Sequence, residues 1–205
     1  MSNIIKSKSK ICRTIGADLW GRPNKKIRKS RPGQHGVKGG TKKLTDYGVQ
    51  LAEKQKFRLY YGDIREKQFY GIYKEATRKK GDTIENLVGL LESRLDAFIF
   101  RTNFARTIYS ARQIVSHKSV KVNNRVVNIR SYVLKPGDVV EITDRAKQMK
   151  VITDSITANE RPIPEYIEMD IPNMSAKYLK VPMFEEIPYA IEMHPHLVIE
   201  FYSRS

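Results

Sequence analysis

The stretches Val120-Lys-Val-Asn-Asn-Arg-Val-Val-Asn128 and Leu134-Lys-Pro-Gly-Asp-Val-Val-Glu-Ile142 decide how the chain folds between residues 94 and 142. In the first, apolar and polar residues alternate around Asn123-Asn124, a pair that tolerates positive φ and suits a tight hairpin. In the second, Lys135-Pro136-Gly137-Asp138 puts Pro and Gly at the centre of a type II turn, and a buried strand follows at 139–142. A helix is expected before them, from Thr107 to His117. The stretch therefore predicts a compact α+β block.

A helical layer is predicted ahead of this block, over residues 45–100. Thr45 or Asp46 can cap its first helix, whose apolar residues recur at multiples of four: Tyr47, Leu51 and Leu59. The next helix has apolar residues at i, i+3, i+4 and i+7 and ends in cations and a glycine: Phe69, Ile72, Tyr73, Ala76, then Lys79-Lys80-Gly81. A third helix begins at Asp82-Thr83-Ile84-Glu85, which has the spacing of a capping box. The fold class expected for the chain is thus α+β.

Prolines punctuate the last part of the chain, at positions 162, 164, 172, 182, 188 and 195, and exclude long helices there. Short strands are expected at 166–169 and 177–181. The terminal stretch from His196 to Tyr202 is apolar, so it must dock on another part of the protein.

The net charge indicates the class of partner. The 205 residues carry a formal charge of +16, which most often means a polyanionic partner and, for a folded cytosolic protein, mostly nucleic acid. Residues 1–60 hold 16 Lys and Arg against 3 Asp and Glu, or +13, and residues 94–150 hold 12 against 4, or +8. Residues 61–93 are neutral, with six of each, and 151–205 hold 4 against 9, or −5. Two separate basic segments are therefore expected to face the partner.

Several classes of protein are excluded by what the sequence lacks. No apolar run approaches the roughly eighteen residues that span a bilayer, and the N-terminus has no signal-peptide core. The one cysteine, Cys12, cannot form an internal disulfide and fits a reducing compartment. We therefore expect a cytoplasmic protein with no membrane partner.

No catalytic or metal-binding motif is evident either. Gly39-Gly40-Thr41-Lys42 resembles a phosphate-binding loop in composition only, and a basic loop is the better interpretation. His194-Pro195-His196 has no cysteine nearby and is more typical of a surface turn. We predict that the chain is not an enzyme, and that it uses no cofactor, no metal and no small-molecule substrate.

The residues of the central block resemble the S-four RNA-binding domain. The similarity lies in Arg94-Leu95-Asp96, in Ala111-Arg112-Gln113-Ile114-Val115-Ser116-His117-Lys118, and in the two stretches quoted at the outset. Pseudouridine synthases of rRNA, a tRNA synthetase appendage and a heat-shock ribosome factor share this module, so by itself it indicates only RNA.

The flanking motifs narrow the resemblance to one family. Pro32-Gly33-Gln34-His35-Gly36, the stretch from Leu44 to Leu51 and the terminal His196–Arg204 are similar to the bacterial small-subunit ribosomal protein S-four family, nearly end to end. The resemblance implies a primary binder of the 5′ domain of 16S-type rRNA that nucleates assembly of the subunit body. It also implies a place where mRNA enters the subunit, an influence on decoding accuracy with ribosomal protein S five, and contacts with other small-subunit proteins.

The resemblance also implies site residues. Cations and polar groups near the helix end and the hairpin are expected to contact RNA, because Arg forks match phosphate geometry: Arg94, Arg101, Arg106, Arg112, His117, Lys118, Lys121, Asn123 and Arg125. Lys54, Lys56 and Arg58 are expected on an RNA face of the helical layer, and His35 is also expected to contact RNA. Lys38, Lys42 and Lys43 are expected beside the incoming mRNA.

One departure from the family concerns zinc. Many members carry four N-terminal cysteines that bind zinc, whereas this chain keeps only Cys12, and a closed zinc site needs about four ligands. Residues 1–44 are therefore expected to be a basic, Gly- and Pro-rich extension that RNA orders.

Residues 45–93 are expected to form a helical domain completed by about 182–205, with the S-four domain at 94–157 and short strands and loops at 158–181.

Two other functions remain open at this point. The chain could act off the ribosome as an assembly factor or translational repressor through the same surface, or it could be a fragment of a pseudouridine synthase. The synthase would need a further catalytic domain, for which no room remains. The sequence does not decide between a bacterial and an organellar source.

Overall fold

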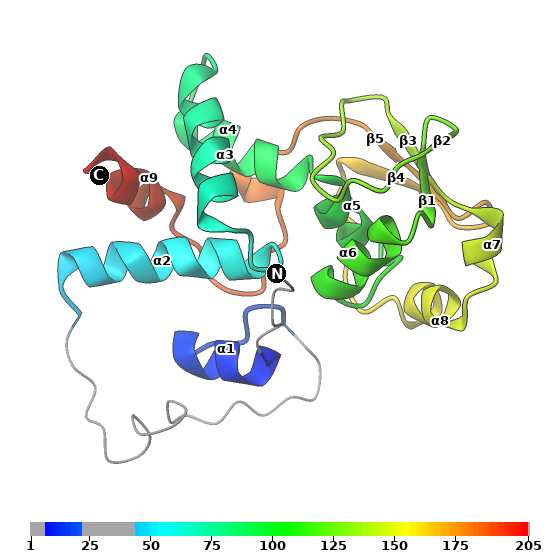
Figure 1. Cartoon of the computed structure of the whole chain (residues 1–205), viewed down its shortest axis with the longest axis horizontal. Coiled ribbons are helices and arrows are strands. Elements are labelled where there is room, and N and C mark those ends of the chain that lie inside the picture. The colour runs from blue at the N-terminus through cyan, green and yellow to red at the C-terminus, as the bar shows by residue number, and fades with distance from the viewer. Residues whose placement is uncertain (1–6, 22–43, 205) are drawn as a thin grey trace. The chain divides into compact units, whose positions relative to one another are not determined.

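The computed structural model describes residues 7–21 and 44–204 and has an α+β architecture, which confirms the predicted fold class (Figure 1). The chain divides into two compact units, Met1–Arg65 with Tyr189–Ser205, and Glu66–Pro188. This grouping places residues 66–93 with the sheet, whereas the sequence predicts a helical domain over residues 45–93. The domain boundary at residue 93 stays a prediction.

The first unit is built from helices α1 (Lys8–Ile15), α2 (Asp46–Tyr60) and α9 (Pro195–Ser203). Thr45 caps α2 as predicted, since its hydroxyl accepts a hydrogen bond from the Gly48 amide at 3.2 Å. The apolar C-terminal stretch forms α9 and lies beside α2 (Figure 1). Gln50 donates to Glu200 at 2.9 Å, and the Tyr47 and Phe201 rings are 5.5 Å apart. The predicted docking of the C-terminal segment on the helical part is thus confirmed.

The buried face of α2 differs from the prediction. Tyr47 is 60% exposed and Leu51 is only half-buried, while the side chains facing inward are Gln50, Glu53, Lys54, Phe57 and Tyr60. Three of these five are polar, and α9 and the segment before it supply their partners. The predicted apolar stripe was therefore wrong.

The second unit begins with a pair of helices, α3 (Glu66–Arg78) and α4 (Thr83–Glu92), followed by α5 (Leu95–Arg101) and α6 (Ile108–Ser116). Asp82 caps α4 through a hydrogen bond from the Ile84 amide at 2.8 Å. Glu85, predicted to close a capping box, instead accepts from the Phe184 amide at 2.8 Å. Thr107 caps α6 by accepting from the Ser110 amide at 3.1 Å.

The sheet has the strand order β2-β1-β3-β5-β4, with all neighbours antiparallel. Its strands are β1 (Val120–Val122), β2 (Arg125–Val126), β3 (Val139–Ile142), β4 (Ile167–Asp170) and β5 (Ser175–Tyr178). Asn123 and Asn124 have φ of 50° and 65°, and Gly137 has φ of 96°, so both predicted turns are confirmed. The segment 158–181 thus adds two strands to the sheet of the central block.

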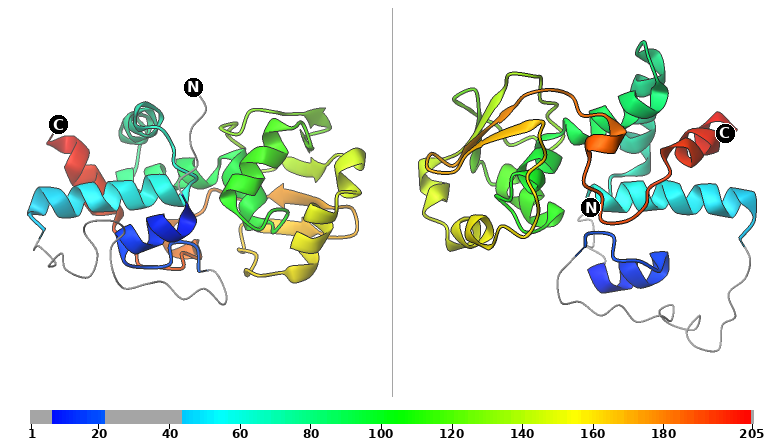
Figure 2. Two further views of the ribbon diagram at one scale, coloured as in Figure 1. Left: turned by 60° about the horizontal axis from the view of Figure 1, so that its bottom comes forward. Right: turned by 180° about the vertical axis from the view of Figure 1, so that it is seen from behind.

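One face of this sheet is covered by helices. Cross-strand pairs such as Val120 with Ile142 and Val140 with Ala176 are buried together. Helices α5 and α6 lie against this face (Figure 2), and the Phe98 ring of α5 packs edge-on against Tyr178 at 5.8 Å. The unit is completed by α7 (Asp144–Lys147), α8 (Lys150–Ala158) and the 3₁₀ turn η2 (Phe184–Glu186).

Tyr178 makes this unit less stable at alkaline pH. Its phenol is buried and bonds to the Ser93 hydroxyl at 2.9 Å. Burial raises the pKa of Tyr178 to about 12, the hydrogen bond to Ser93 partly opposes this, and the charge of Glu92 adds to it. The stabilisation is fully present below the unfolded pKa of about 10 and is lost as the pH rises to about 12, by up to about 2 kcal/mol. Denaturant unfolding at a series of pH values should show this loss of stability in the unmodified protein and not in Tyr178→Phe. If the free energy of unfolding fell equally with pH in both proteins, the prediction would be contradicted.

Candidate nucleic-acid interface

The end of α6 and the β1–β2 hairpin bring together the exposed part of the predicted site. His117 directly follows the last residue of α6, and Lys118 comes next with φ of 60°, which turns the chain sharply toward β1. His117, Lys118, Asn123 and Arg125 are all exposed. Lys121 is partly covered and lies 3.5 Å from Asp144, whose pKa is lowered by the cations Lys121 and Lys147. The short segment from His117 to Arg125, called the turn below, thus presents several cations.

Asn123 holds two turns of this surface together. Its amide nitrogen donates to Asp138 at 2.9 Å, and its oxygen accepts from the Val139 amide at 3.0 Å. Asp138 in turn accepts from the Lys135 amide at 2.8 Å. The polar groups of Asn123 therefore fix the 123–124 turn against the 135–138 turn.

A cluster of arginines surrounds the buried carboxylate of Asp96. Arg94 donates two hydrogen bonds to it, at 2.9 and 2.8 Å, and is itself buried. The Nε of Arg112 lies 3.6 Å from the same carboxylate and, within the described residues, has no hydrogen-bond partner although it is buried. Desolvation lowers the pKa of Arg112; Asp96 opposes this, while the nearby cations Arg130 and Arg94 lower the pKa further. One carboxylate thus faces two guanidinium groups, with a third cation, Arg130, close enough to lower the pKa of Arg112, so the cluster keeps an excess of positive charge.

Arg101 lies inside the protein, although it was predicted as an RNA contact. Its guanidinium donates two hydrogen bonds to Glu92, at 3.0 and 2.7 Å, and a third to the Pro188 carbonyl at 3.2 Å. Glu92 also accepts from the Tyr166 hydroxyl at 3.0 Å. A buried arginine requires such pairing, and here it joins α4, α5 and the segment leading into β4.

The three predicted cations of α2 also make contacts within the protein. Lys54 is 5% exposed, and its ammonium lies over the Phe201 ring at 4.2 Å. Lys56 pairs with Glu53 and donates to the Glu192 carbonyl at 3.2 Å. Arg58 donates to the Ile64 carbonyl at 2.7 Å. All three cations of α2 are therefore engaged within the first unit, Lys54 and Lys56 with the C-terminal segment and Arg58 with the segment just after the helix.

Arg106 is exposed, with its Nε 3.8 Å from Glu160 and a hydrogen bond to the Asp154 carbonyl at 3.3 Å. The remaining predicted residues, His35, Lys38, Lys42 and Lys43, lie outside the described residues.

Sequence reasoning missed two residues of the arginine cluster. Asp96 was quoted only as part of a motif, yet it positions Arg94 and Arg112. Arg130 is exposed, and its carbonyl accepts from the Asp96 amide at 3.2 Å, which fixes its segment beside the cluster. The spacing Arg94-x-Asp96 was an available signal for the pair, whereas the approach of Arg130 depends on the loop between β2 and β3.

Other kinds of site were sought among residues 7–21 and 44–204. These residues contain no group of three His, Cys, Asp or Glu side chains placed to hold a metal ion. Nor does any helix formed by them combine the length and the apolar character that crossing a membrane requires.

Comparison with known proteins decides the family. Residues 3–92 match the family model described as ribosomal protein S4/S9 N-terminal domain, and residues 93–140 match the S4 domain model. Proteins called small ribosomal subunit protein uS4 are similar over the whole of both chains, with 52% identity in Bartonella bacilliformis and Rhizobium meliloti and 48% in a Bradyrhizobium species. The chain belongs to the uS4 family.

Membership in the uS4 family confirms the predicted resemblance and the RNA-binding domain within it. The protein is a structural component of the small ribosomal subunit that binds rRNA together with other subunit components, as predicted, and it is not an enzyme. The predicted location, in the small ribosomal subunit, is confirmed by the same bacterial relatives.

Proposed function

We propose that this uS4 protein is a primary binder of the 5′ domain of 16S-type rRNA and nucleates assembly of the subunit body. The observation that carries the proposal is the arginine cluster around Asp96, which keeps positive charge beside an exposed turn of further cations. Such a surface fits the phosphate groups of a folded RNA, which position a protein by charge and shape.

The proposed contacts divide into two kinds. Arg106, Arg112, His117, Lys118, Lys121 and Arg125, with Arg130, would touch RNA, and Asn123 would hold the turns that present them. Arg94 and Arg101 would support this surface through Asp96 and Glu92. Lys54, Lys56 and Arg58 would act through the packing of α9 on α2 and the end of α2.

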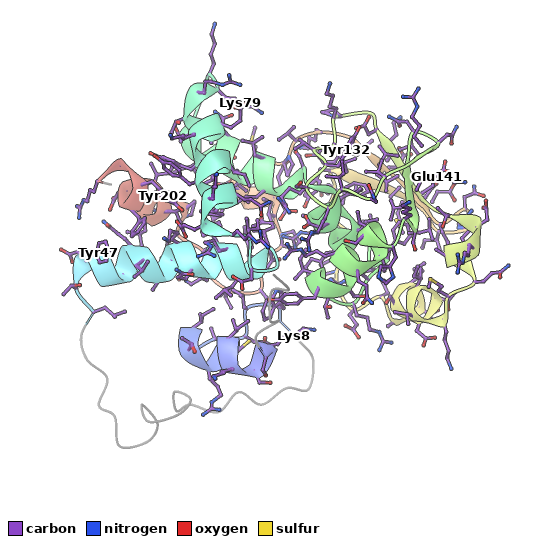
Figure 3. All side chains as sticks on the ribbon, in the orientation of Figure 1. Lys8, Tyr47, Lys79, Tyr132, Glu141 and Tyr202 are labelled. Atoms are coloured by element: carbon purple, nitrogen blue, oxygen red, sulfur yellow. The ribbon has the colours of Figure 1, made fainter. Side chains whose placement is uncertain are left out.

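Two further roles are proposed on other parts of the chain. Lys38, Lys42 and Lys43 would lie beside mRNA where it enters the subunit. Exposed apolar residues at the start of α2 would contact ribosomal protein S five and thereby influence decoding accuracy: Leu44, Tyr47 and Val49, which are 50%, 60% and 38% exposed. Figure 3 labels Tyr47 on α2 and Tyr202 on α9, the pair of helices that forms this end of the first unit.

Binding to 5′-domain RNA should weaken steeply with salt. Each phosphate neutralised contributes about 0.7–0.9 to the slope of log affinity against log salt. The double variant Lys118→Gln/Arg125→Gln should therefore lower the slope by about 1.4–1.8. Filter binding over a salt series measures this slope. The control is Arg145→Gln/Lys150→Gln, which removes the same two positive charges from α7 and α8. A flat salt dependence of the unmodified protein would contradict rRNA binding through phosphates.

Sedimentation separates this function from an assembly factor or a translational repressor acting on free RNA. The protein should remain with mature small subunits in high salt. Its release into the free pool would favour the alternative.

A further inference from the structure

Helix α3 carries a stripe of exposed residues that the interface above does not use. Lys67, Tyr70, Lys74 and Arg78 are exposed, at spacings of three and four residues, whereas Phe69 and Ala76 are buried. At about 100° per residue, the four fall within an arc of about 80°, opposite the buried pair. We call these four residues the α3 stripe.

The α3 stripe is cationic, and two of its side chains contact one another. No acidic residue lies within it: Glu66 and Glu75 flank it on either side, and Glu75 pairs with Arg78 at 2.9 Å. The ammonium of Lys74 lies over the Tyr70 ring at 4.7 Å, and the Tyr70 and Tyr73 rings are nearly parallel with centroids 6.2 Å apart. Lys79 and Lys80 are also exposed and continue the positive charge past the end of the helix, where Figure 3 labels Lys79.

Stabilisation of the helix itself does not account for this arrangement. Cations near a helix C-terminus interact favourably with the helix dipole, which explains Arg78 and the lysines after it. Lys67 lies in the first turn, where the dipole disfavours a cation. The exposed pair between Arg78 and Glu75 contributes little to stability.

Gly71 provides a second and independent observation. It lies in the middle of α3 beside the stripe and is exposed, and a Cβ built there would meet nothing within 4 Å. Glycine inside a helix is less stable than alanine, so folding gains nothing from this residue. A missing side chain does let a ligand approach the helix backbone closely, next to Tyr70 and Lys74.

We propose that the α3 stripe, with Gly71, is a second RNA-binding surface, which takes the sugar–phosphate backbone of rRNA and stacks a base or ribose on Tyr70. The inference rests on the rRNA-binding function proposed above. Lys67 and Arg78 are about 16 Å apart along the axis, a length over which a strand presents several phosphates. Cations beside an aromatic ring are the combination that binds nucleic-acid strands without reading their sequence.

The test uses the full chain and 5′-domain RNA. Lys67→Gln/Lys74→Gln/Arg78→Gln should lower affinity at least tenfold near physiological salt and lower the salt slope by about 2.1–2.7. The control Arg145→Gln/Lys150→Gln/Lys177→Gln removes the same charge from exposed positions elsewhere in the second unit and should change both much less. Tyr70→Leu should weaken binding, while Tyr70→Phe, which keeps the ring, should bind RNA like the unmodified protein.

Gly71→Ala supplies a measurement that a purely structural role would not produce. It should raise the thermal stability of the protein and yet weaken RNA binding by several fold, because the added methyl group blocks close approach. Unchanged affinity and slope in the triple variant, with normal binding by the unmodified chain, would overturn this proposal alone. Failure of the unmodified chain to bind would overturn the proposed function with it. If the triple variant lost binding to another subunit protein and kept its binding to RNA, that result would also overturn the α3 stripe proposal, in favour of a protein partner.

Discussion

Glu92→Leu is expected to lower the free energy of unfolding by about 3–5 kcal/mol, because it leaves the guanidinium of Arg101 buried without its counter-charge. The Glu92 side chain is fully buried and accepts hydrogen bonds from Arg101 and Tyr166. Arg101 is 3% exposed, so water would not replace the lost carboxylate. Equilibrium denaturation in urea measures the change.

The pair also separates two roles of Arg101. In Glu92→Leu/Arg101→Met both charges are removed, and most of the lost stability should return, since apolar residues of similar volume often replace a buried ion pair at little cost. If Arg101 acts only by stabilising the fold, this double variant should bind 5′-domain RNA with the same salt dependence of affinity as the unmodified protein. A folded double variant with a lower salt slope would show instead that Arg101 contacts phosphate directly. Glu160→Gln, at the exposed pair with Arg106, serves as the control and should cost less than about 1 kcal/mol.

The parts of this fold that could be predicted from sequence are those set by nearest neighbours. Asn123-Asn124 and Pro136-Gly137 form the expected turns because positive φ is tolerated only by a few residue types. Thr45, Asp82 and Thr107 cap helices because their oxygens reach an amide two or three residues ahead. None of these contacts needs knowledge of the tertiary structure.

The parts that could not be predicted depend on distant partners. Lys54 is buried because Phe201 lies beneath its ammonium, and Glu53 and Gln50 face inward because His194 and Glu200 supply hydrogen-bonding groups. Arg101 is buried because Glu92, which also accepts a hydrogen bond from Tyr166, meets it in the core. A charged residue in a helical pattern is normally assigned to the surface, so the burial of Lys54 and Arg101 could not be predicted from the sequence.

Arg112→Gln is expected to lower affinity for 5′-domain RNA by about 10- to 100-fold, the equivalent of losing about 1.5–3 kcal/mol of charged hydrogen bonds. It should not lower stability. The Nε of Arg112 is buried without a hydrogen-bond partner among the described residues, and the guanidinium is crowded by Arg94 and Arg130 beside a single carboxylate. Removing it relieves desolvation and like-charge repulsion, so the free energy of unfolding should stay constant or rise by up to about 1 kcal/mol.

The opposite signs of these two effects make the prediction decisive. An arginine held in an unfavourable state by the free protein is one that a phosphate can stabilise, because the phosphate supplies the missing charge and hydrogen-bond acceptor. Arg112→Lys keeps the charge but loses the planar fork, so its affinity should lie between those of Arg112→Gln and the unmodified protein. Urea unfolding and a salt series on each variant give both quantities. If Arg112→Gln lost stability and bound RNA normally once the folded fraction was accounted for, Arg112 would be a structural residue, and RNA contact would rest on the exposed cations of the turn alone.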